Sequence, residues 1–595
     1  MNPRGSDRAL ESSPRHYRHG AALRQTPRPA DWTRFIGELG STGSARGKLT
    51  DQVAPRQMEL ELERQESPAR EWVASSPDNQ ATAAMSSQST FSIGDHELDP
   101  AVVDATFGTA FHAAVAPGVV QRIAAGRRAI ESILREDDPV YGVNTGFGSL
   151  CDRSIPAEQL VALQQNLLLS HAVGVGAATP DEIVRLMLLF KAHALARGHS
   201  GVRPVVVERL VALLNADVLP VVPRKGSLGA SGDLAPLAHL SLPLIGRGEV
   251  RLHGERIATK KALKKYGIEP MGLAAKEGLA LINGTQFMTA YGAAICVRAK
   301  RACKTADLLA AMSLEAVRGR LDPFDERLHA LRPHPGAIEV AENVRGLLAS
   351  RPANPSKPYG TRVQDPYSLR CVPQVHGATR DVIRHVEGVV YRDINSVTDN
   401  PVITHDGAVL SGGNFHGQPV ALALDYLACA TAELASISER RQYLLLHNRE
   451  YHLPPALIED SGLHSGFLIA QYTSASLVAE NKILCHPASV DSIPTAGGQE
   501  DHVSMGATSA VKGWTIMDNV ETVLAIELLL AAQALDFSPA DDVAPAIRAA
   551  HQAVRQRIAF LDRDREIAAD LGMALSQVRC GDVLGATERV TGPLK

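Results

Sequence analysis

Apolar residues recur at helical spacing along most of this 595-residue chain, from about residue 99 onward. Two such stretches, residues 419–446 and 507–537, are far longer than the average helix of about 11 to 12 residues. Helices of that length usually bury their apolar faces in a bundle, and often against other subunits. The pattern therefore predicts a mainly α-helical fold built on a long-helix bundle.

Shorter elements are expected before and between the long helices. Leu160, Leu163 and Leu167 lie three and four residues apart, so they share one face of a predicted helix with His171. A single histidine on an apolar face is more often a satisfied core residue than a functional one. Residues 250–257 and 401–410 each contain a turn between two short apolar runs, which predicts two small β-hairpins on a helical body.

Residues 1–91 differ from the rest of the chain. Arg, Ser, Pro and Gln are frequent there, and no apolar periodicity could bury much surface. This composition predicts a disordered N-terminal extension, followed by one domain over residues 92–595. Acidic residues argue against a transit peptide, and no apolar segment typical of a secretory signal follows Met1.

Composition and charge exclude several classes of partner. The formal net charge of −4 gives no global field that would attract nucleic acid or an acidic membrane, whereas a small zwitterionic ligand is compatible. The apolar run at residues 523–537 is shorter than the about 20 residues that span a bilayer, which indicates a buried helix. The seven cysteines are scattered, which favours a reducing cytoplasm over a disulfide framework.

Neither a metal nor a nucleotide is expected as cofactor. The 21 histidines form no His-Glu-x-x-His motif, and the histidines stand apart from partners of the ligand type. No Walker-type or Rossmann glycine pattern occurs in a suitable context.

Polar, glycine-containing segments interrupt the helical pattern where an ordinary helical protein would have only short caps. They are residues 141–148, 226–239, 283–286, 364–370, 411–417 and 497–502. Each segment alone could be ordinary loop chemistry, and residues 141–148 could equally be a mobile loop that presents Tyr141. Together they indicate one assembled site.

The segment at residues 226–239 allows an unusual backbone reaction at Ala230, Ser231 and Gly232. Its small side chains leave room for the Gly232 nitrogen to attack the Ala230 carbonyl carbon. Loss of water there and from the Ser231 hydroxymethyl would leave a methylidene group on an imidazolone, which is a strong electrophile. Asp233 and Pro236 suit the first turn of a helix, whose N-terminal partial charge would stabilise negative charge on the ring.

A family resemblance rests on the longer stretch Gly226-Ser227-Leu228-Gly229-Ala230-Ser231-Gly232-Asp233-Leu234-Ala235-Pro236-Leu237-Ala238-His239. It closely resembles the prosthetic-group segment of the aromatic amino acid ammonia-lyases, and of the histidine ammonia-lyases among them. The other polar segments match in the same order, over roughly residues 92–595. The resemblance implies a helical ammonia-lyase fold with the electrophile above helix N-termini, and a homotetramer whose active sites each draw on three chains.

The resemblance also implies a cofactor and the residues that act on it. Ala230, Ser231 and Gly232 would form a 4-methylidene-imidazol-5-one group autocatalytically, with no external cofactor. Tyr141 resembles the family's catalytic base, and Asn283 resembles the residue that contacts the prosthetic group and assists its formation. Because the ordinary pKa of tyrosine is about 10, Tyr141 would need neighbouring positive potential to act as a base.

The remaining site residues implied by the resemblance concern the substrate. Gln364, Tyr367 and Arg370 resemble the family's site segment, in which the arginine holds the substrate carboxylate through a bidentate pair. Phe415, in Gly-Gly-Asn-Phe-His-Gly, resembles the residue packed beside the ring. Leu468 lies where histidine ammonia-lyases carry a methionine of similar volume.

Substrate choice rests chiefly on His171 and Glu500. The pairs Ser170-His171 and Gln499-Glu500 follow the histidine ammonia-lyase pattern rather than that of the phenylalanine and tyrosine enzymes. Glu500 can accept a hydrogen bond from an imidazole N–H or take the amine proton, and His171 can hydrogen-bond the other ring nitrogen. The resemblance therefore implies conversion of L-histidine to trans-urocanate and ammonia.

Three alternatives stay open at this stage, because His464 and Gly498 also depart from the residues frequent in histidine ammonia-lyases. A histidine 2,3-aminomutase of the same family would return the amine to the β-carbon. A tyrosine ammonia-lyase would use His171 to bind a phenol. A non-catalytic scaffold would have kept only the helical body, and the intact Ser231, Tyr141 and Arg370 argue against it.

Overall fold

The computed structural model describes residues 90–107, 111–136, 139–352, 359, 362–447, 451 and 453–595, all within one compact unit of the chain. The predicted disordered extension, residues 1–91, lies outside the described residues except for its last two positions. Strand β1 (Phe91–Ile93) begins there, so the expected domain boundary at residue 92 falls one residue into a strand.

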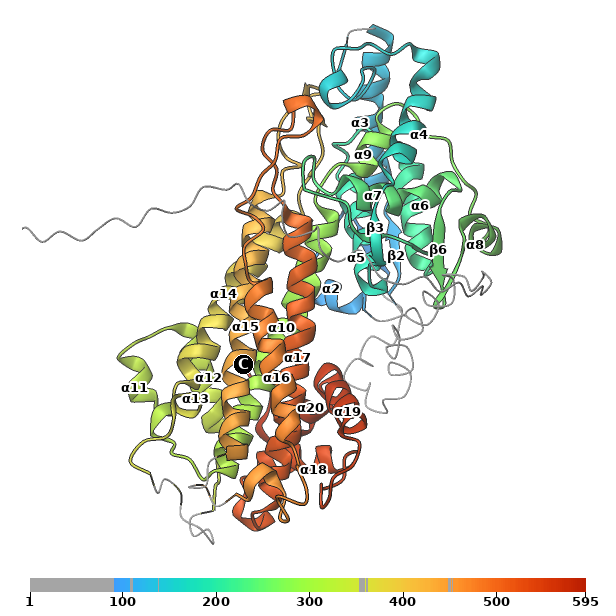
Figure 1. Ribbon diagram of the computed structural model, residues 1–595. Helices are drawn as coiled ribbons and strands as arrows, with labels where there is room; N and C mark the ends of the chain where they lie inside the picture. Colours follow the sequence, from blue (N-terminus) through green and yellow to red (C-terminus); the bar gives the residue numbers. More distant parts are fainter. Residues whose placement is uncertain are drawn as a thin grey trace, which may run out of the picture. The chain divides into compact units, whose positions relative to one another are not determined.

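Helices dominate the described residues, which confirms the mainly α-helical prediction (Figure 1). In chain order they are α2 (Pro100–Ala105), α3 (Pro117–Glu136), α4 (Leu160–His171), α5 (Asp181–Ala196), α6 (Pro204–Asn215), α7 (Leu234–Ser241), α8 (Thr259–Tyr266), α9 (Glu277–Ile282), α10 (Gln286–Ala316), α11 (Glu326–Ala330), α12 (Pro335–Leu347), α13 (Tyr367–Arg370), α14 (Val372–Ile394), α15 (Gln418–His447), α16 (Leu468–Leu484), α17 (Gly506–Asp536), α18 (Pro545–Arg555), α19 (Ile567–Cys580) and α20 (Asp582–Thr591).

The long helices α10, α14, α15 and α17 run side by side and form the predicted bundle (Figure 1). Helices α15 and α17 begin and end within one residue of the two long apolar stretches. Residues 523–535 of α17 are buried, as predicted for that apolar run. Among the described residues, α15 alone is long and apolar enough to cross a membrane, and its most apolar window is 67% buried, as in a core helix.

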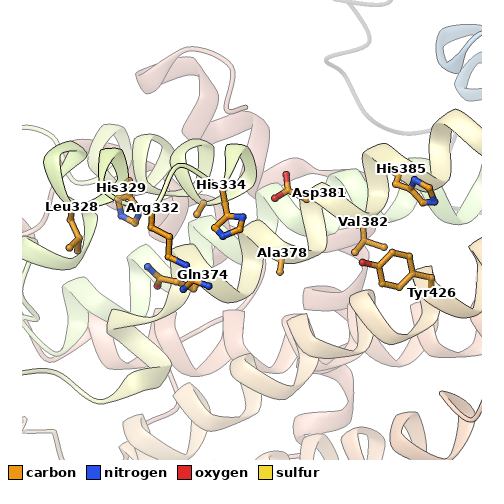
Figure 2. Close-up of a pocket in the computed structure, with 11 residues that line it drawn as sticks. Leu328, His329, Arg332, His334, Gln374, Ala378, Asp381, Val382, His385 and Tyr426 are labelled. Atoms are coloured by element: carbon orange, nitrogen blue, oxygen red, sulfur yellow. The ribbon is translucent and has the colours of Figure 1, made fainter. Parts of the chain in front are cut away.

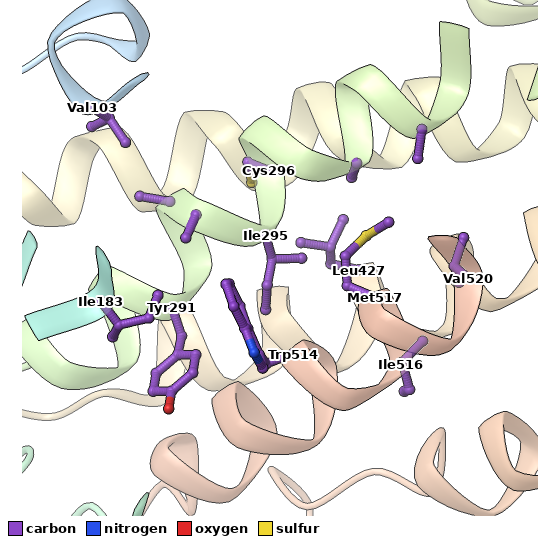
Figure 3. Packing of buried hydrophobic residues seen from close by; sticks show 14 of the residues in the cluster. Val103, Ile183, Tyr291, Ile295, Cys296, Leu427, Trp514, Ile516, Met517 and Val520 are labelled. Atoms are coloured by element: carbon purple, nitrogen blue, oxygen red, sulfur yellow. The ribbon is translucent and has the colours of Figure 1, made fainter. Parts of the chain in front are cut away.

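Aromatic and aliphatic side chains fill the space between α10 and α17 (Figure 3). The ring of Tyr291 on α10 meets that of Trp514 on α17 nearly edge-on, with the centroids 5.7 Å apart. This is one of the two arrangements that aromatic pairs prefer. Ile295 and Met517 are fully buried beside them, so the two helices share one continuous apolar core.

One buried ion pair joins three of the long helices. Arg441 of α15 and Glu527 of α17 are fully buried, with Nε 2.6 Å from Oε1 and Nη2 2.8 Å from Oε2. The Ser313 hydroxyl of α10 donates to the same carboxylate at 2.8 Å. Because an unpaired charge in this interior would cost several kcal/mol, the pair requires these helices to pack in this register.

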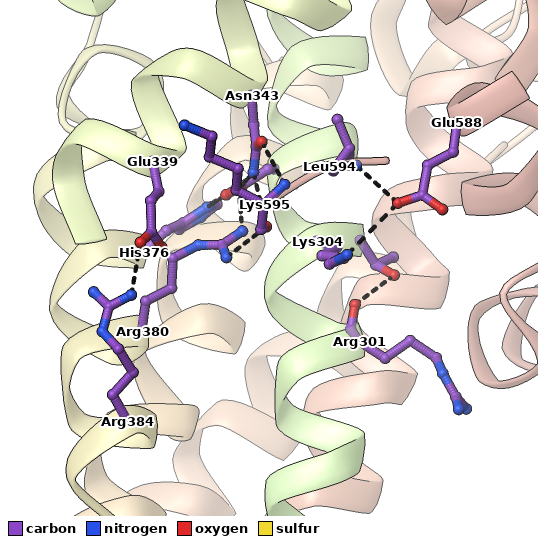
Figure 4. A network of polar contacts seen from close by, with 12 residues as sticks. Arg301, Lys304, Glu339, Asn343, His376, Arg380, Arg384, Glu588, Leu594 and Lys595 are labelled. Carbon is purple, nitrogen blue, oxygen red and sulfur yellow. Dashed lines mark hydrogen bonds and ion pairs between the residues drawn. The ribbon is translucent and has the colours of Figure 1, made fainter. Parts of the chain in front are cut away.

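The last two residues of the chain are tied to the bundle (Figure 4). The Leu594 amide donates to Glu588 Oε1 at 3.0 Å. The Lys595 carbonyl oxygen accepts from Arg380 Nη1 at 2.8 Å and from Asn343 Nδ2 at 3.2 Å. These bonds link the C-terminal helix α20 to α12 and α14.

The strands are short and peripheral to the bundle. They are β1, β2 (Ala113–Val115), β3 (Val175–Ala178), β4 (Leu219–Pro220), β5 (Pro223–Lys225), β6 (Glu249–Leu252), β7 (Glu255–Ala258), β8 (Val402–Ile403) and β9 (Val409–Leu410). Strand β1 pairs with β2 in parallel, whereas β3 with β5 and β4 with β6 are antiparallel. The antiparallel pairs β6–β7 and β8–β9 confirm both predicted hairpins.

Candidate active site

The turn that carries Ser231 is held against the break between α9 and α10. The Gly284 amide donates to the Ser231 carbonyl oxygen at 3.3 Å, and the Gly284 carbonyl oxygen accepts from the Asp233 amide at 2.7 Å. Gly232 has φ +79°, and a Cβ there would lie 2.1 Å from the Gly284 oxygen. Only glycine fits at this position, because any side chain would push the two backbones apart.

Helix N-termini gather at this turn. Helix α7 begins three residues after Ser231, and α10 begins two residues after Gly284. Helix α17 begins beside the same segment, where the Met505 amide donates to the Leu228 carbonyl oxygen at 3.0 Å. Each helix start carries a partial positive charge of about half an electron. This geometry agrees with the expectation that the segment lies above helix N-termini.

Asp233 occupies the predicted position at the start of α7, but its carboxylate serves another helix. It makes no capping bond to α7. Its Oδ2 instead accepts from the amides of Phe287 at 2.9 Å and Met288 at 3.0 Å, in the first turn of α10. Burial raises the pKa of Asp233 to about 7 in spite of these two bonds. The capping partner lies more than fifty residues away along the chain, which sequence spacing does not reveal.

A cavity of about 530 Å³ opens over Ser231. Predicted residues from four separate polar segments line it, namely Tyr141, Ala230, Ser231, Phe415 and Glu500. The structure thus brings together residues that lie up to several hundred positions apart in the sequence.

The Glu500 carboxylate points at the Ser231 hydroxyl. Its Oε1 accepts from Ser231 Oγ at 3.3 Å, and its Oε2 accepts from Thr495 Oγ1 at 2.9 Å. The Thr495 amide also donates to the Glu500 carbonyl oxygen at 2.8 Å, which closes the intervening turn. The carboxylate is therefore oriented by its own loop and exposed to the cavity.

Tyr141 lies in the cavity wall in an environment that opposes its ionisation. Burial raises its pKa, a hydrogen bond from the Gly148 backbone lowers it, and the Glu500 carboxylate raises it further. The other ionisable groups that act on it, Cys151 and Asp399, also raise the pKa. Within this chain, the strongest influences on Tyr141 therefore favour its neutral form.

The loop after Tyr141 is anchored to the fold. Residues 142–146 are buried, and Val143 packs in a small apolar cluster with Ile130 and Ile403. The expected mobile loop thus has a fixed base, and Tyr141 at its start is positioned by packing.

His171 ends helix α4 and is half-buried. Its Nδ1 lies 3.1 Å from Ser170 Oγ. Burial lowers its pKa, although the Leu167 carbonyl and the Glu500 carboxylate act in the opposite direction. The ring lies within electrostatic range of Glu500 but is not among the residues that line the Ser231 cavity.

Asn283 lies in the break that grips the Ser231 turn. The residue is buried, and its carbonyl oxygen accepts from Lys191 Nζ at 2.6 Å. Its side-chain Oδ1 is buried without a hydrogen-bond partner among the described residues. A buried amide oxygen left unpaired is costly, so this atom can accept a hydrogen bond from a donor that enters the site.

The other predicted residues lie elsewhere. Gln364 and Arg370 line a separate groove, and Tyr367 beside them is 70% exposed. The Arg370 guanidinium stacks over the Tyr367 ring, 4.4 Å from its centroid. Leu468 begins helix α16 and packs partly against the core. We refer to these four as the Arg370 group, and to Tyr141, His171, Ala230, Ser231, Gly232, Asn283, Phe415 and Glu500 as the Ser231 group.

The length of helix α15 gives the distance between the two groups. Phe415 lies three residues before its first residue, Gln418. Near its other end, Arg441 Nη1 donates to the carbonyl oxygen of Ser368 in α13, at 3.5 Å. A helix rises by about 1.5 Å per residue, so Gln418 and Arg441 lie about 35 Å apart. A single amino acid substrate cannot reach both groups of one chain.

A further cavity of about 570 Å³ lies near the Arg370 group, between α11, α12, α14 and α15 (Figure 2). It shares Leu328, Arg332 and Gln374 with the groove of Arg370. None of the predicted site residues lines it. Within the described part of the chain, no group of three or more His, Cys, Asp or Glu could hold a metal ion.

Sequence reasoning missed Cys151 and Asn400, which line the Ser231 cavity, and gave no separate role to Ser411 of the segment 411–417. Asn400 and Ser411 flank the β8–β9 hairpin. They lie just before β8 and just after β9, and the Asn400 side chain accepts from the Gly412 amide at 2.7 Å. The hairpin between them was expected to be a peripheral decoration. Its Asn-Pro start and Gly-Gly end were the available signals of a shaped loop.

Comparison with known proteins decides the family. A family model described as aromatic amino acid lyase matches residues 98–556. The chain belongs to the aromatic amino acid lyase family. It is similar to the histidine ammonia-lyase of Symbiobacterium thermophilum, at 52% identity over 84% of this chain and 99% of the relative. The histidine ammonia-lyase of Sorangium cellulosum is 52% identical over 80% of this chain and 94% of the relative.

Solved structures in this family share the fold. The histidine ammonia-lyase of Trypanosoma cruzi has a TM-score of 0.78 at 39% identity, covering 84% of this chain and 95% of that one. The tyrosine aminomutase of Streptomyces globisporus has a TM-score of 0.81 at 36% identity, covering 85% and 100%. These similarities confirm the predicted ammonia-lyase fold and the class of carbon–nitrogen lyase.

Proposed function

We propose that this enzyme is an ammonia-lyase that converts L-histidine to trans-urocanate and ammonia. The observation that carries the proposal is the convergence of Tyr141 and Glu500 on Ser231, in one cavity at a cluster of helix N-termini. The relatives at about 50% identity carry the name histidine ammonia-lyase. Membership of the family supports the reaction class, and His171 and Glu500 are the residues that favour histidine as the substrate.

The prosthetic group is proposed to form from Ala230, Ser231 and Gly232, with no external cofactor. A bond forms between Gly232 N and the Ala230 carbonyl carbon, and one water carries away the Ala230 oxygen with the amide hydrogens of Ser231 and Gly232. A second water takes the Ser231 hydroxyl and its α-hydrogen. Once formed, the 4-methylidene-imidazol-5-one supplies an electrophile for the substrate amine, which makes it a better leaving group.

The residues around Ser231 fit this group. The amide of Gly232 makes no hydrogen bond with the described residues, so it is free to attack. The Gly284 amide holds the Ser231 carbonyl oxygen, which stays on the ring, rather than either oxygen that leaves.

Three residues of this cavity, with His171 nearby, then act on the substrate. Tyr141 accepts the proton from the β-carbon, which is the step that needs a general base. Glu500 accepts a hydrogen bond from an imidazole N–H or takes the amine proton, and His171 binds the other ring nitrogen. Phe415 packs beside the ring of the substrate.

The complete site is proposed to form between chains of a homotetramer, with the Arg370 group supplied by a neighbouring copy. The about 35 Å between Gln418 and Arg441 along α15 supports this arrangement. So do the large apolar side chains exposed on α15 and α16, because exposed apolar surface marks interfaces. They are Leu422, Tyr426, Tyr443, Ile469, Tyr472 and Ile483. The enzyme is placed in the cytoplasm, without a nucleic acid or membrane partner.

An aminomutase is the second candidate, because the tyrosine aminomutase structure superimposes as well as the histidine ammonia-lyase structure. Both reactions begin alike, and they differ in whether ammonia leaves or returns to the β-carbon. Product analysis separates them, because an aminomutase yields an isomer with the mass of its substrate.

The proposal is tested by incubating the purified protein with L-histidine, and in parallel with L-tyrosine, while near-ultraviolet absorbance and product mass are followed. Urocanate and free ammonia from histidine, with the Ser231→Ala chain inactive, are the expected results. A β-amino acid of unchanged mass would replace the lyase by an aminomutase. Coumarate from tyrosine with no turnover of histidine would instead establish a tyrosine ammonia-lyase.

A further inference from the structure

The break between α9 and α10 sets the position of the Ser231 turn. Helix α9 ends at Ile282 and α10 begins at Gln286, so only Asn283, Gly284 and Thr285 separate them. The backbone of Gly284 bonds to Ser231 on one side and to Asp233 on the other. A shift of the break would therefore move the atoms that must form the ring.

Lys191 of α5 holds one side of this break. Its side chain is only 1% exposed, and its Nζ donates to the carbonyl oxygens of Asn283 at 2.6 Å and Ala280 at 3.3 Å. These carbonyls belong to the last turn of α9 and the residue after it, where the helix offers no amide partner. A cation is also favoured at that end of the helix dipole. Lys191 thus caps the C-terminus of α9.

Asp233 holds the other side of the break with the opposite charge. Its carboxylate caps the N-terminus of α10 through the amides of Phe287 and Met288. Burial lowers the pKa of Lys191 to about 7 and raises that of Asp233 to about 7, while each group favours the ionised form of the other. A buried amino group and a buried carboxyl group therefore cap the two helix ends that face each other across three residues.

We propose that Lys191 is a positioning residue for the cyclisation of Ala230, Ser231 and Gly232. This inference rests on the proposed function, because that function requires the ring. By fixing the Asn283 carbonyl, Lys191 keeps Gly284 in register with the turn while Gly232 N approaches the Ala230 carbon. Lys191 touches neither the reacting atoms nor the substrate cavity, so its role ends when the ring has formed.

The test replaces the ammonium by an apolar chain of similar length, Lys191→Met. The whole chain is made by cell-free synthesis, and its intact mass is followed in time for the loss of two water molecules. The control is Lys512→Met, which removes a partly buried ammonium that pairs with Asp425 and donates to the His486 carbonyl oxygen at 2.6 Å, away from the break. Assembly state and melting temperature are recorded for each variant.

Lys191→Met is expected to assemble as the parent does and to lose water at least about tenfold more slowly, the effect of one lost charged hydrogen bond. The kcat per dehydrated site should equal that of the parent, and Lys512→Met should dehydrate at the parental rate. A purely structural role would lower assembly or melting temperature without slowing dehydration of the folded chains. If Lys191→Met is insoluble, Lys191→Gln, which keeps an N–H donor without the charge, answers the same question.

Two outcomes would overturn the inference in distinguishable ways. A folded Lys191→Met chain that loses both waters at the parental rate removes the role of Lys191 alone. A parent chain that keeps its full mass overturns the proposed function itself, and the role of Lys191 with it.

Discussion

The Ser231 group and the Arg370 group lie toward opposite ends of helix α15 and are built in different ways. Around Ser231, backbone bonds, helix starts and a buried carboxylate hold every part in place. Around Arg370, side chains are exposed, with Tyr367 at 70% and Val363 at 91%. This difference supports the proposed assembly, in which the two groups from neighbouring copies complete one site.

Their charges differ in the same way. Within its own chain, burial and the nearby Glu500, Cys151 and Asp399 raise the pKa of Tyr141, and the Gly148 backbone hydrogen bond lowers it. The groove of the Arg370 group contains Arg320, Arg327, Arg332 and Arg370 together with Asp322, Asp325 and Asp365, and Arg320 and Arg327 pair with Asp322 and Asp325. Since a general base at Tyr141 needs positive potential, Arg370 of a neighbouring copy is the cation that the proposed assembly would bring to it.

The largest expected effect comes from the centre of the Ser231 group. Ser231→Ala removes the hydroxyl that leaves as the second water, so the methylidene cannot form. Turnover should fall by at least about 10⁴-fold, equal to about 5.5 kcal/mol of activation free energy. The intact mass of the variant should show no loss of two water molecules, and the variant should assemble as the parent does. Ser241→Ala, a buried hydroxyl bonded within α7, is the control. Full activity of Ser231→Ala would refute the electrophile.

Tyr141→Phe should have the next largest effect. It keeps the ring packing but removes the proton acceptor, which general base catalysis makes worth about 10² to 10⁴-fold in kcat. The mass of the mature chain should be unchanged, because Tyr141 is not part of the ring. Tyr266→Phe, on the exposed helix α8, serves as the control. A kcat equal to that of the parent would assign the base to another residue.

The Arg370→Gln variant tests the Arg370 group. Loss of a bidentate bond to the substrate carboxylate should lower kcat/KM by about 10²-fold. Loss of its charge should also move the rising limb of the pH profile to higher pH, because a cation lowers the pKa of Tyr141 and its removal raises it. Arg384→Lys, paired with Glu339 on the surface, is the control. An unchanged pH profile would show that the charge of Arg370 does not act on the pKa of Tyr141.

Leu468→Met should have the smallest effect. The two side chains have similar volume, and such exchanges usually cost less than about 1.5 kcal/mol. We expect KM for L-histidine to change by less than about threefold, which corresponds to about 0.65 kcal/mol. A larger gain for histidine, without a gain for tyrosine, would make Leu468 a determinant of specificity.

Apolar periodicity predicted the bundle closely, because α15 and α17 are long enough for their buried faces to dominate the pattern. The residues of both groups were found through their polar segments and the family resemblance. The distance between the two groups could not be predicted from the sequence. Periodicity assigns residues to helices, but it does not show which helix ends lie close together. For the same reason the bond from Asp233 to α10 and the place of Asn400 in the cavity wall needed the structure.

The most direct test mixes two inactive chains, Ser231→Ala and Arg370→Ala, by co-expression and assays the purified assemblies with L-histidine. If each site combines Ser231 from one chain with Arg370 from another, random assembly leaves about a quarter of the sites intact, and activity returns to about a quarter of the parental value. If one chain supplied both residues, no site would be intact. A mixture as inactive as either variant alone would contradict the shared site.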